Sequence, residues 1–307
     1  MILIAGAGAI GQMVAARLVL SGQPVQCLVR DRFVTPLQNA RVHGKTEYEG
    51  PLDAVTEPAG PYDIIIITAK AHQTHEIAAQ LQPHLAPDGT VVSIQNGLGN
   101  QQKLERFFDA EQVVVGLTSQ GATIQEPGVV YHAGLGPTKL GGPRAEAIAE
   151  LLAPLQPTVH EDIREQVWTK AIVNAALNPL GAIFGCKNGE VYADPDRRAL
   201  AKAITAECWA LATKARVDIP DPWPAVESIM QMTADNKCSM LQDVEAKRPT
   251  EIEQITGRLV RLGELLLVSM PKNDYVYGRL KDLERSYLGS DSEEMAFLEL
   301  EWARDPF

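Results

Sequence analysis

The chain opens with Met1-Ile2-Leu3-Ile4-Ala5-Gly6-Ala7-Gly8-Ala9-Ile10-Gly11, an apolar run that passes directly into the pattern Gly-x-Gly-x-x-Gly. An amphipathic stretch from Gln12 to Ser21 follows, and Val25–Val29 is a second apolar run. A strand, a glycine turn, a helix and a strand within about thirty residues have the spacing of a right-handed βαβ unit. This opening predicts an α/β domain of the Rossmann type, with a doubly wound sheet.

Three further apolar runs extend the α/β pattern: Asp63–Thr68, Val91–Ile94 and Val113–Leu117. Their β-branched character is expected of strands buried on both faces, and helical candidates at His75–Leu81 and Gln101–Phe107 lie between them. The alternation predicts a mostly parallel sheet covered by helices. Beyond it, two antiparallel closing strands joined by a glycine-rich turn are expected at Val129–His132 and Thr138–Leu140.

The pattern of hydrophobic residues changes after Asp162. Helical periodicity then recurs, without a convincing strand, over Ile163–Phe184, Arg197–Ala215, Ala225–Met232 and Glu251–Leu267. We therefore expect a Rossmann domain over residues 1–163 and an all-α domain over residues 164–307. The acidic stretch Ser290–Phe307 is predicted to be a solvated terminal helix, with an interaction tail as the alternative.

Composition narrows the class of protein. Of 307 residues, 45% are hydrophobic and 22% are charged, close to the averages of soluble globular proteins. The net charge of −11 disfavours a general binder of nucleic acids or anionic membranes. The four cysteines lie far apart, which indicates neither a disulfide framework nor a zinc site. With no signal peptide and no run of about 18–20 apolar residues, a cytoplasmic protein is expected.

The glycine pattern carries the first functional prediction, a site for a dinucleotide. Gly6 permits a tight turn, Gly8 lets the backbone approach a pyrophosphate, and Gly11 lets helix and strand pack closely. The N–H groups and dipole of the helix N-terminus stabilise phosphates. The alternative is a glycine-rich turn without a ligand. The cofactor-binding residues predicted from this pattern are Gly6, Ala7, Gly8, Ala9, Ile10 and Gly11.

The residues after the second strand bear on the choice of cofactor. NAD sites usually place Asp or Glu there to bind the ribose 2′-OH, whereas this chain has Arg30-Asp31-Arg32. The guanidinium of Arg30 suits a 2′-phosphate because it offers forked, charge-assisted donors. We therefore expect NADPH, although Asp31 could still serve NAD if the strand ends one residue later.

Polar residues also follow two other predicted strands. Ligands of open parallel sheets lie beyond the carboxyl ends of the strands, where Lys70 and Asn96 are expected. A lysine at this place is also compatible with a solvated surface, and an Asn-Gly pair with a simple turn. No metal site is predicted, because His72, His75 and His84 lack the spacing of metal ligands on one element.

A sharper pattern lies in the helical half of the chain. Lys170, Asn174 and Asn178 recur at every fourth residue, on one stripe of a helix with apolar surroundings. Buried polar groups need partners, so the stripe meets either other polar residues or a polar ligand. Pro179 adds a distortion, because it removes one backbone N–H bond and crowds the carbonyl of Ala175.

Taken together, these motifs resemble those of the ketopantoate reductases (2-dehydropantoate 2-reductases) over nearly the whole chain. The pieces that carry the resemblance are Gly6–Gly11, Arg30, Lys70–Gln73, Asn96–Gly99, Lys170–Asn174, Asn178–Leu180, Ser239–Asp243, Arg248 and Thr250–Ile252. The glycine loop is shared by many dehydrogenases. The lysine–asparagine helix and the Ser-Met-Leu-Gln-Asp stretch are more specific, and their occurrence in this order argues against coincidence.

The resemblance implies an NADPH-dependent reduction of 2-dehydropantoate to (R)-pantoate, on the route to pantothenate and coenzyme A. It implies that Lys170 is the general acid and that Glu251 supports it or holds the nascent hydroxyl. The helical domain would then carry substrate binding and catalysis, and a homodimer is compatible with the pattern. The implied substrate-binding residues are Asn174, Asn178, Ser239 and Asn96, and Lys70 and Asn96 would lie near the nicotinamide and its ribose.

Several features depart from the family's pattern. Thr118–Ala122 stands where many relatives have a threonine-rich segment with histidine, and Thr256-Gly257 stands where Asn-Gly is expected. The acidic C-terminal stretch has no clear counterpart. These departures leave another 2-keto acid open as the substrate.

Two other functions remain as alternatives. A hydroxyacid or opine-type dehydrogenase would need a different acid, commonly histidine, in the helical domain, and residues 163–307 contain none. A catalytically silent redox sensor would bind the dinucleotide, but it would have no need for Lys170 together with Glu251.

Overall fold

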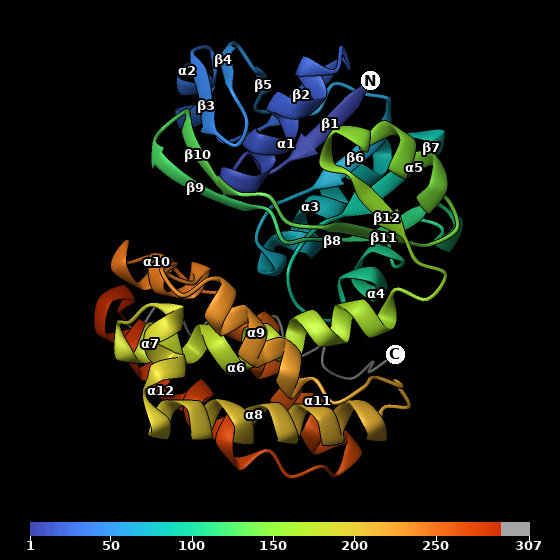
Figure 1. The fold of residues 1–307 in the computed structure, drawn as a ribbon. Coiled ribbons are helices and arrows are strands. Elements are labelled where there is room, and N and C mark those ends of the chain that lie inside the picture. The colour runs from blue at the N-terminus through green and yellow to red at the C-terminus, as the bar shows by residue number, and fades with distance from the viewer. Residues whose placement is uncertain (290–307) are drawn as a thin grey trace. The chain divides into compact units, whose positions relative to one another are not determined.

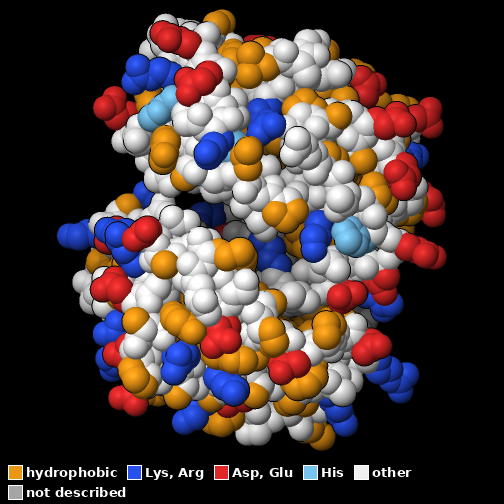
Figure 2. All heavy atoms as spheres, in the orientation of Figure 1, with side chains coloured by type: hydrophobic (Ala, Val, Ile, Leu, Met, Phe, Trp, Pro, Cys, Tyr) orange, Lys and Arg blue, Asp and Glu red, His pale blue; other side chains and the backbone are white. Residues whose placement is uncertain are grey.

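The computed structural model describes residues 1–289, so the predicted terminal helix over Ser290–Phe307 lies outside the described residues. The chain divides into two compact units, the first from Met1 to Ile163 and the second beginning at Arg164 (Figure 1). Each unit is described by itself. On the face shown in Figure 2, acidic and basic side chains are interspersed over much of the surface, and acidic side chains predominate along the right margin of its upper half.

The first unit is built on an eight-stranded sheet with the order β12-β11-β8-β7-β6-β1-β2-β5. Neighbouring strands are parallel except β8 and β11, which are antiparallel. The mostly parallel sheet predicted from the apolar runs is therefore confirmed. The strands are β1 Ile2–Ala5, β2 Val25–Leu28, β5 Asp53–Val55, β6 Tyr62–Ile67, β7 Leu85–Ser93, β8 Val113–Thr118, β11 Thr138–Gly141 and β12 Pro157–Val159.

Both faces of this sheet are covered, which explains why its strands read as continuous apolar runs. Alternate residues of β1 belong to different cores. Ile2 and Ile4 pack with residues of α1, whereas Leu3 and Ala5 pack with Ala78 and Leu81 of α3 on the other face. The helices of this unit are α1 Ala9–Leu20, α2 Val34–Leu37, α3 Thr74–Leu81, α4 Asn100–Leu104 and α5 Ala145–Leu151.

A second, four-stranded sheet corrects the expectation for the closing strands. Its order is β4-β3-β10-β9, so β10 (Val129–Gly134) pairs antiparallel with β9 (Gly121–Glu126) and not with β11. The reason is the two-residue turn Pro127-Gly128 between β9 and β10, in which Gly128 has φ +81°. A Pro-Gly pair with positive φ at glycine is typical of a tight turn. The remaining strands are β3 Ala40–Gly44 and β4 Tyr48–Gly50.

The second sheet also changes the environment of α1. This helix was expected to be amphipathic, but every residue from Gly11 to Ala16 is buried. Val14 and Leu18 pack in the core of the large sheet, while Ala16 packs with Val42 and Val130 of the small sheet. The expectation was wrong because the small sheet covers the face that would otherwise meet water.

The second unit is all-helical over its described residues, which agrees with the predicted fold class. Three predicted helices begin and end within two residues of the observed ones, and Glu251–Leu267 instead divides into a π-helix and α11. The helices are α6 Arg164–Phe184, α7 Asn188–Ala193, α8 Pro195–Lys214, α9 Trp223–Met232, α10 Ser239–Glu245, the π-helix Glu253–Gly257, α11 Arg258–Leu266 and α12 Pro271–Leu288.

Helix α6 is the centre of this unit, and it packs against α8, α10 and α12. Its buried residues include Trp168, Ile172 and Leu180. Pro179 lies inside the helix, yet α6 continues to Phe184. The proline thus removes one backbone donor without ending the helix.

Candidate active site

The glycine loop between β1 and α1 has three glycines in three different environments. Gly6 has φ +100°, and a Cβ there would lie 2.6 Å from the backbone nitrogen of Ala69. A Cβ at Gly11 would lie 2.3 Å from the carbonyl oxygen of Gly6 and 2.6 Å from Oγ1 of Thr68. Gly8, in contrast, has no other heavy atom within 4 Å of the Cβ position. Gly6 and Gly11 are therefore needed for packing, and only Gly8 faces open space.

The start of α1 fits a pyrophosphate group. Gly8 is the residue before the helix and offers no side chain to cap it, and the first turn contains no acidic residue. The N–H groups and the dipole of the first turn therefore remain available to an anion. The open space at Gly8 leaves room for that anion to approach the backbone.

Thr68 holds this loop in place, a role that the sequence analysis did not assign. Its hydroxyl donates a hydrogen bond of 2.5 Å to the carbonyl of Gly6. Thr68 is the first residue after β6, the strand that neighbours β1. A hydroxyl at the carboxyl end of an adjacent strand was the available signal, but only the strand order shows which loop it would reach.

The predicted cofactor residues lie along one edge of the sheet. Asn96, Lys70, the glycine loop and Arg30 follow β7, β6, β1 and β2, which are consecutive in the sheet. The chain leaves β1 toward β2 on one side and returns to β6 on the other. Crevices at such reversals are where open α/β sheets bind ligands. The structure thus brings these four parts of the chain to one place in the first unit.

The segment after β2 bears on the 2′-group of the cofactor ribose. The strand ends at Leu28, and Arg30, Asp31 and Arg32 are all exposed. The guanidinium of Arg32 stacks on the ring of Phe33 at 4.8 Å. The side chain of Arg30 forms no hydrogen bond or ion pair with any other residue in the range 1–289. Of the two arginines, Arg30 is therefore the one whose guanidinium makes no contact of these kinds with residues 1–289.

Gln95 fixes the segments that carry Lys70 and Asn96. Its side-chain amide donates to the carbonyl of Ala69 at 3.0 Å and to the hydroxyl of Thr74 at 2.9 Å. The carbonyl of Asn96 accepts a hydrogen bond of 2.9 Å from the side chain of Asn100. Gln95 is buried and connects the two loops, so it is a supporting residue that the sequence analysis did not single out.

In the second unit, the stripe on α6 contains a desolvated lysine. Lys170 keeps some exposed surface, but burial of its ammonium group lowers its pKa to about 8. The negative charge of Glu251 opposes this shift and raises the pKa. Glu251 is itself buried, with 7% of its surface exposed. The structure therefore brings these two predicted residues within electrostatic reach of each other.

The two amides of the stripe are not part of a closed polar network. Asn174 is half-buried and Asn178 is buried. Neither side chain forms a hydrogen bond within the portion of the chain that the structure describes. The donors and acceptors of both amides are therefore available to a polar ligand.

Ser239 is linked to the same part of α6 through its neighbour. It is the first residue of α10 and is exposed. The preceding thiol, Cys238, donates to the backbone carbonyl of Asn178 at 3.4 Å. Burial raises the pKa of Cys238 to about 11, so the thiol keeps its proton and can donate. This contact ties the start of α10 to the asparagine stripe.

The backbone next to Glu251 is anchored by residues that the sequence did not reveal. The N–H of Thr250 donates to the carboxylate of Glu284 at 2.7 Å. The π-helix Glu253–Gly257 follows, and Glu253 accepts hydrogen bonds from Tyr277 at 2.6 Å and Arg261 at 3.0 Å. π-Helical turns frequently occur at functional sites. The backbone on both sides of Glu251 is thus fixed by carboxylates that contact α11 and α12, the buried Glu284 and the half-buried Glu253.

Of the two departures from the family's pattern, Thr118–Ala122 is partly buried and Thr256-Gly257 is buried. Within Thr118–Ala122, the side chain of Gln120 binds another residue of the first unit: its Oε1 accepts a hydrogen bond of 2.8 Å from Nε2 of His132. Thr256 lies in the π-helix and is fully buried. A Cβ at Gly257 would lie 2.9 Å from the ring of Tyr277, so this glycine is required for packing.

No group of three or more His, Cys, Asp or Glu side chains in residues 1–289 is arranged to hold a metal ion. None of the helices in that range has the length and apolar character needed to cross a membrane.

A parallel sheet with a glycine loop at its edge, followed by a helical unit with a desolvated lysine, is the plan of a two-domain dinucleotide-dependent oxidoreductase. The comparison with protein-family models specifies the family. The model "Ketopantoate reductase PanE/ApbA" matches residues 2–144, and "Ketopantoate reductase PanE/ApbA C terminal" matches residues 162–284. The chain belongs to the ketopantoate reductase family, which confirms the resemblance recognised from its sequence.

Individual relatives agree with this assignment. A 2-dehydropantoate 2-reductase of Archaeoglobus fulgidus is 36% identical over 270 residues, which are 85% of this chain and 90% of the relative. A solved structure of D-mandelate dehydrogenase with NADH and anilino(oxo)acetate is 25% identical, with a TM-score of 0.88 over 93% of this chain and 98% of that one. A PanE/ApbA family ketopantoate reductase from Ralstonia eutropha shares the fold, with 24% identity, a TM-score of 0.87 and coverage of 94% and 100%.

The glycine loop gives a paired prediction. Gly11→Ala should lower the free energy of unfolding by about 1–3 kcal/mol, the usual cost of overpacking, because its Cβ would overlap the Gly6 carbonyl. Gly8→Ala should leave thermal stability unchanged, because this residue is extended and faces open space. It should instead weaken dinucleotide binding. Thermal denaturation and a fluorescence titration with the coenzyme measure the two effects.

Each variant is the control for the other. Coenzyme binding of wild-type strength in Gly8→Ala would show that the pyrophosphate does not approach this backbone. An unchanged thermal midpoint in Gly11→Ala would contradict the packing between the loop and Thr68.

Proposed function

We propose that this protein reduces the ketone of 2-dehydropantoate to (R)-pantoate with NADPH, a step on the route to pantothenate and coenzyme A. We assign the dinucleotide to a domain of residues 1–163 and the substrate to a domain of residues 164–307. The observation that carries the proposal is Lys170, whose pKa is lowered to about 8 beside the carboxylate of Glu251. The names of the curated relatives supply the substrate.

Lys170 is the proposed general acid. The bound nicotinamide supplies hydride to the ketone carbon, so negative charge develops on the ketone oxygen. An ammonium group stabilises that charge and delivers the proton that makes the hydroxyl. With a pKa of about 8, Lys170 is still mostly protonated at neutral pH, yet it releases its proton far more readily than an ordinary lysine.

Glu251 and the asparagines have complementary roles in this proposal. The carboxylate of Glu251 limits the fall of the lysine pKa, and it can accept a hydrogen bond from the new hydroxyl. Asn174 and Asn178 have amides without partners in residues 1–289, so they are available to the substrate. As neutral groups, they hold a keto acid without further lowering the lysine pKa. We add Ser239 to this set because α10 begins beside Asn178.

The choice of NADPH rests on Arg30. Its exposed guanidinium has no partner among the residues described and lies at the position expected to face the ribose 2′-group. Lys70 and Asn96 follow neighbouring strands at the same sheet edge. We propose that these two residues lie near the nicotinamide and its ribose.

A reductase of another 2-keto acid is the second candidate, because the D-mandelate dehydrogenase structure superposes with a TM-score of 0.88. The discriminating experiment is a steady-state assay of ketopantoate, 2-ketoisovalerate, pyruvate and benzoylformate with NADPH and with NADH. The proposal expects the highest kcat/KM for ketopantoate with NADPH. A higher value for benzoylformate would establish the second candidate, and coenzyme binding without turnover of any keto acid would indicate a redox sensor.

Arg30→Ala tests the cofactor assignment. Loss of the guanidinium should weaken NADPH binding by about tenfold or more, the worth of one charge-assisted hydrogen bond. NADH binding should change little, because NADH has no 2′-phosphate. Arg32→Ala is the matched control, since Arg32 is also exposed but stacks on Phe33. Equal weakening of both coenzymes by Arg30→Ala would remove the basis for NADPH.

The pH dependence of kcat tests Lys170. An acid must be protonated to act, so kcat should fall as pH rises through about 8, the pKa of Lys170. Glu251→Gln should move this fall to lower pH, because the carboxylate raises the lysine pKa. Lys170→Ala should lower kcat by about 10²–10⁴-fold.

Lys214→Ala is the control for these measurements, because Lys214 is an exposed lysine at the end of α8. A pH limb that stays in place in Glu251→Gln would show that the carboxylate does not act on Lys170. Near-normal turnover in Lys170→Ala would rule out the lysine as the acid.

A further inference from the structure

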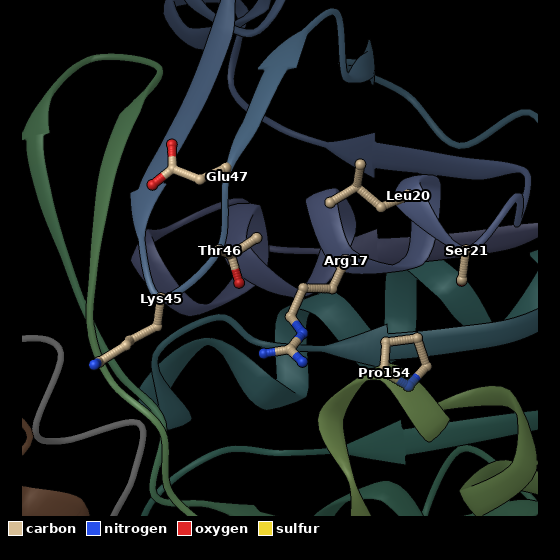
Figure 3. Close-up of a pocket in the computed structure, with 7 residues that line it drawn as sticks. All are labelled: Arg17, Leu20, Ser21, Lys45, Thr46, Glu47 and Pro154. Carbon is tan, nitrogen blue, oxygen red and sulfur yellow. The ribbon is translucent and has the colours of Figure 1, made fainter.

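A recess of about 370 Å³ lies in the first unit at the C-terminal end of α1 (Figure 3). Its walls come from the last turn of α1, from the turn between β3 and β4, and from Pro154. Gly8 and Arg17 are separated by nine residues of sequence, which is about 14 Å along a helix. The recess is therefore distinct from the glycine loop at the other end of α1.

Arg17 brings an uncompensated charge to this recess. One terminal nitrogen of its guanidinium is buried and has no hydrogen-bond partner among the residues described. Arg17 forms no ion pair with them either, and burial lowers its pKa. Buried polar groups in native proteins nearly always have a partner, so an orphaned cationic donor indicates an acceptor beyond the residues that the structure describes.

Lys45 supplies a second positive charge. It is exposed in the turn after β3 and, like Arg17, its side chain forms no hydrogen bond or ion pair in residues 1–289. Both cations act on the neighbouring His132. Burial is the main cause of the lowered pKa of His132, and the positive charges of Arg17 and Lys45 lower this pKa further. The two cations therefore act on the same small region.

His132 itself adds no charge. Its Nε2 lies 2.8 Å from Oε1 of Gln120, which can only accept, so Nε2 carries the ring proton. Nδ1 then accepts from the hydroxyl of Thr46 at 2.9 Å. The buried ring is a neutral support that fixes Thr46 in the wall of the recess.

The carboxylate that lines the recess does not neutralise these cations. Glu47 accepts a hydrogen bond of 3.0 Å from the backbone N–H of Gly44. Figure 3 shows its carboxylate turned away from the direction in which Arg17 and Lys45 extend. The last turn of α1 presents the negative end of the helix dipole, so an anion here would depend on the two cationic side chains.

We propose that this recess binds a small organic phosphate, with the phosphate group paired to Arg17 and Lys45. Two positive charges match a phosphate monoester, which carries about −1.5 to −2 charges at neutral pH, better than they match a single carboxylate. The planar guanidinium offers two parallel donors to phosphate oxygens. A volume of about 370 Å³ exceeds the needs of the phosphate group alone, which leaves room for its organic part.

The test is an amide NMR titration of the full chain with glycerol 3-phosphate at constant ionic strength. Saturable shifts are expected at Ser21, Lys45 and Thr46, and Arg17→Met or Lys45→Met should weaken the affinity about tenfold or more. Arg41→Met is the matched control, because Arg41 is an exposed cation on β3 outside the recess. It should bind like the wild type.

Three results would overturn the proposal. Shifts confined to Gly8–Gly11 and Arg30 would show phosphate binding only at the dinucleotide loop. Equal affinity in Arg17→Met and the wild type would show that the guanidinium does not bind the ligand. Acetate binding as tightly as glycerol 3-phosphate would show a site for carboxylates instead.

Thermal stability separates a binding role from a structural one. In phosphate-free buffer, Arg17→Met should have a thermal midpoint no lower than that of the wild type, because the buried nitrogen has no partner to lose. Glycerol 3-phosphate should raise the midpoint of the wild type and of Arg41→Met, but not that of Arg17→Met. A lower midpoint for Arg17→Met in phosphate-free buffer would make Arg17 a structural residue and overturn the proposal.

Discussion

The close approach of the glycine loop to the end of β6 is the contact on which the first unit depends. There is no room for a side chain at Gly11, where a Cβ would lie 2.3 Å from the carbonyl oxygen of Gly6. Thr68 donates its hydroxyl to that same carbonyl. This packing sets the start of α1 at the carboxyl ends of β1 and β6 and leaves its first turn without a side-chain cap. The proposed phosphate site is therefore a consequence of how the helix packs.

The large sheet could be predicted from the sequence because each strand carries its own signal. Ile65–Ile67 are fully buried, as a continuous β-branched run requires when helices cover both faces. The small sheet carries no such signal, because β3 and β10 pair between Arg41 and Val129, far apart in the chain. Local periodicity cannot reveal a partner at that distance. The wrong expectation of an amphipathic α1 has the same origin, since Val42 and Val130 cover its second face.

In the candidate site, too, the features that depend on local spacing could be predicted from the sequence, and those that depend on distant contacts could not. Lys170, Asn174 and Asn178 share a face of one helix, so their spacing predicted a polar stripe. Their surroundings depend on contacts between distant residues, such as Thr250 with Glu284 and Cys238 with Asn178. The π-helix after Glu251 could not be predicted from the sequence either, because one extra residue per turn hardly changes the spacing of the apolar residues. From the sequence alone the stripe could face either a ligand or a polar network. In the structure the two amides form no hydrogen bond within residues 1–289, so they remain available to a ligand.

The two ends of α1 place opposite demands on an anion site. At the N-terminus, backbone N–H groups and the helix dipole attract phosphate, so the only requirement on the sequence is a small residue such as Gly8. At the C-terminus the dipole repels an anion, and attraction must come from side chains. Arg17 and Lys45 supply it there, while the Glu47 carboxylate is bound to the N–H of Gly44. An orphaned guanidinium is unfavourable in the free protein, and a phosphate is the kind of partner that removes this penalty.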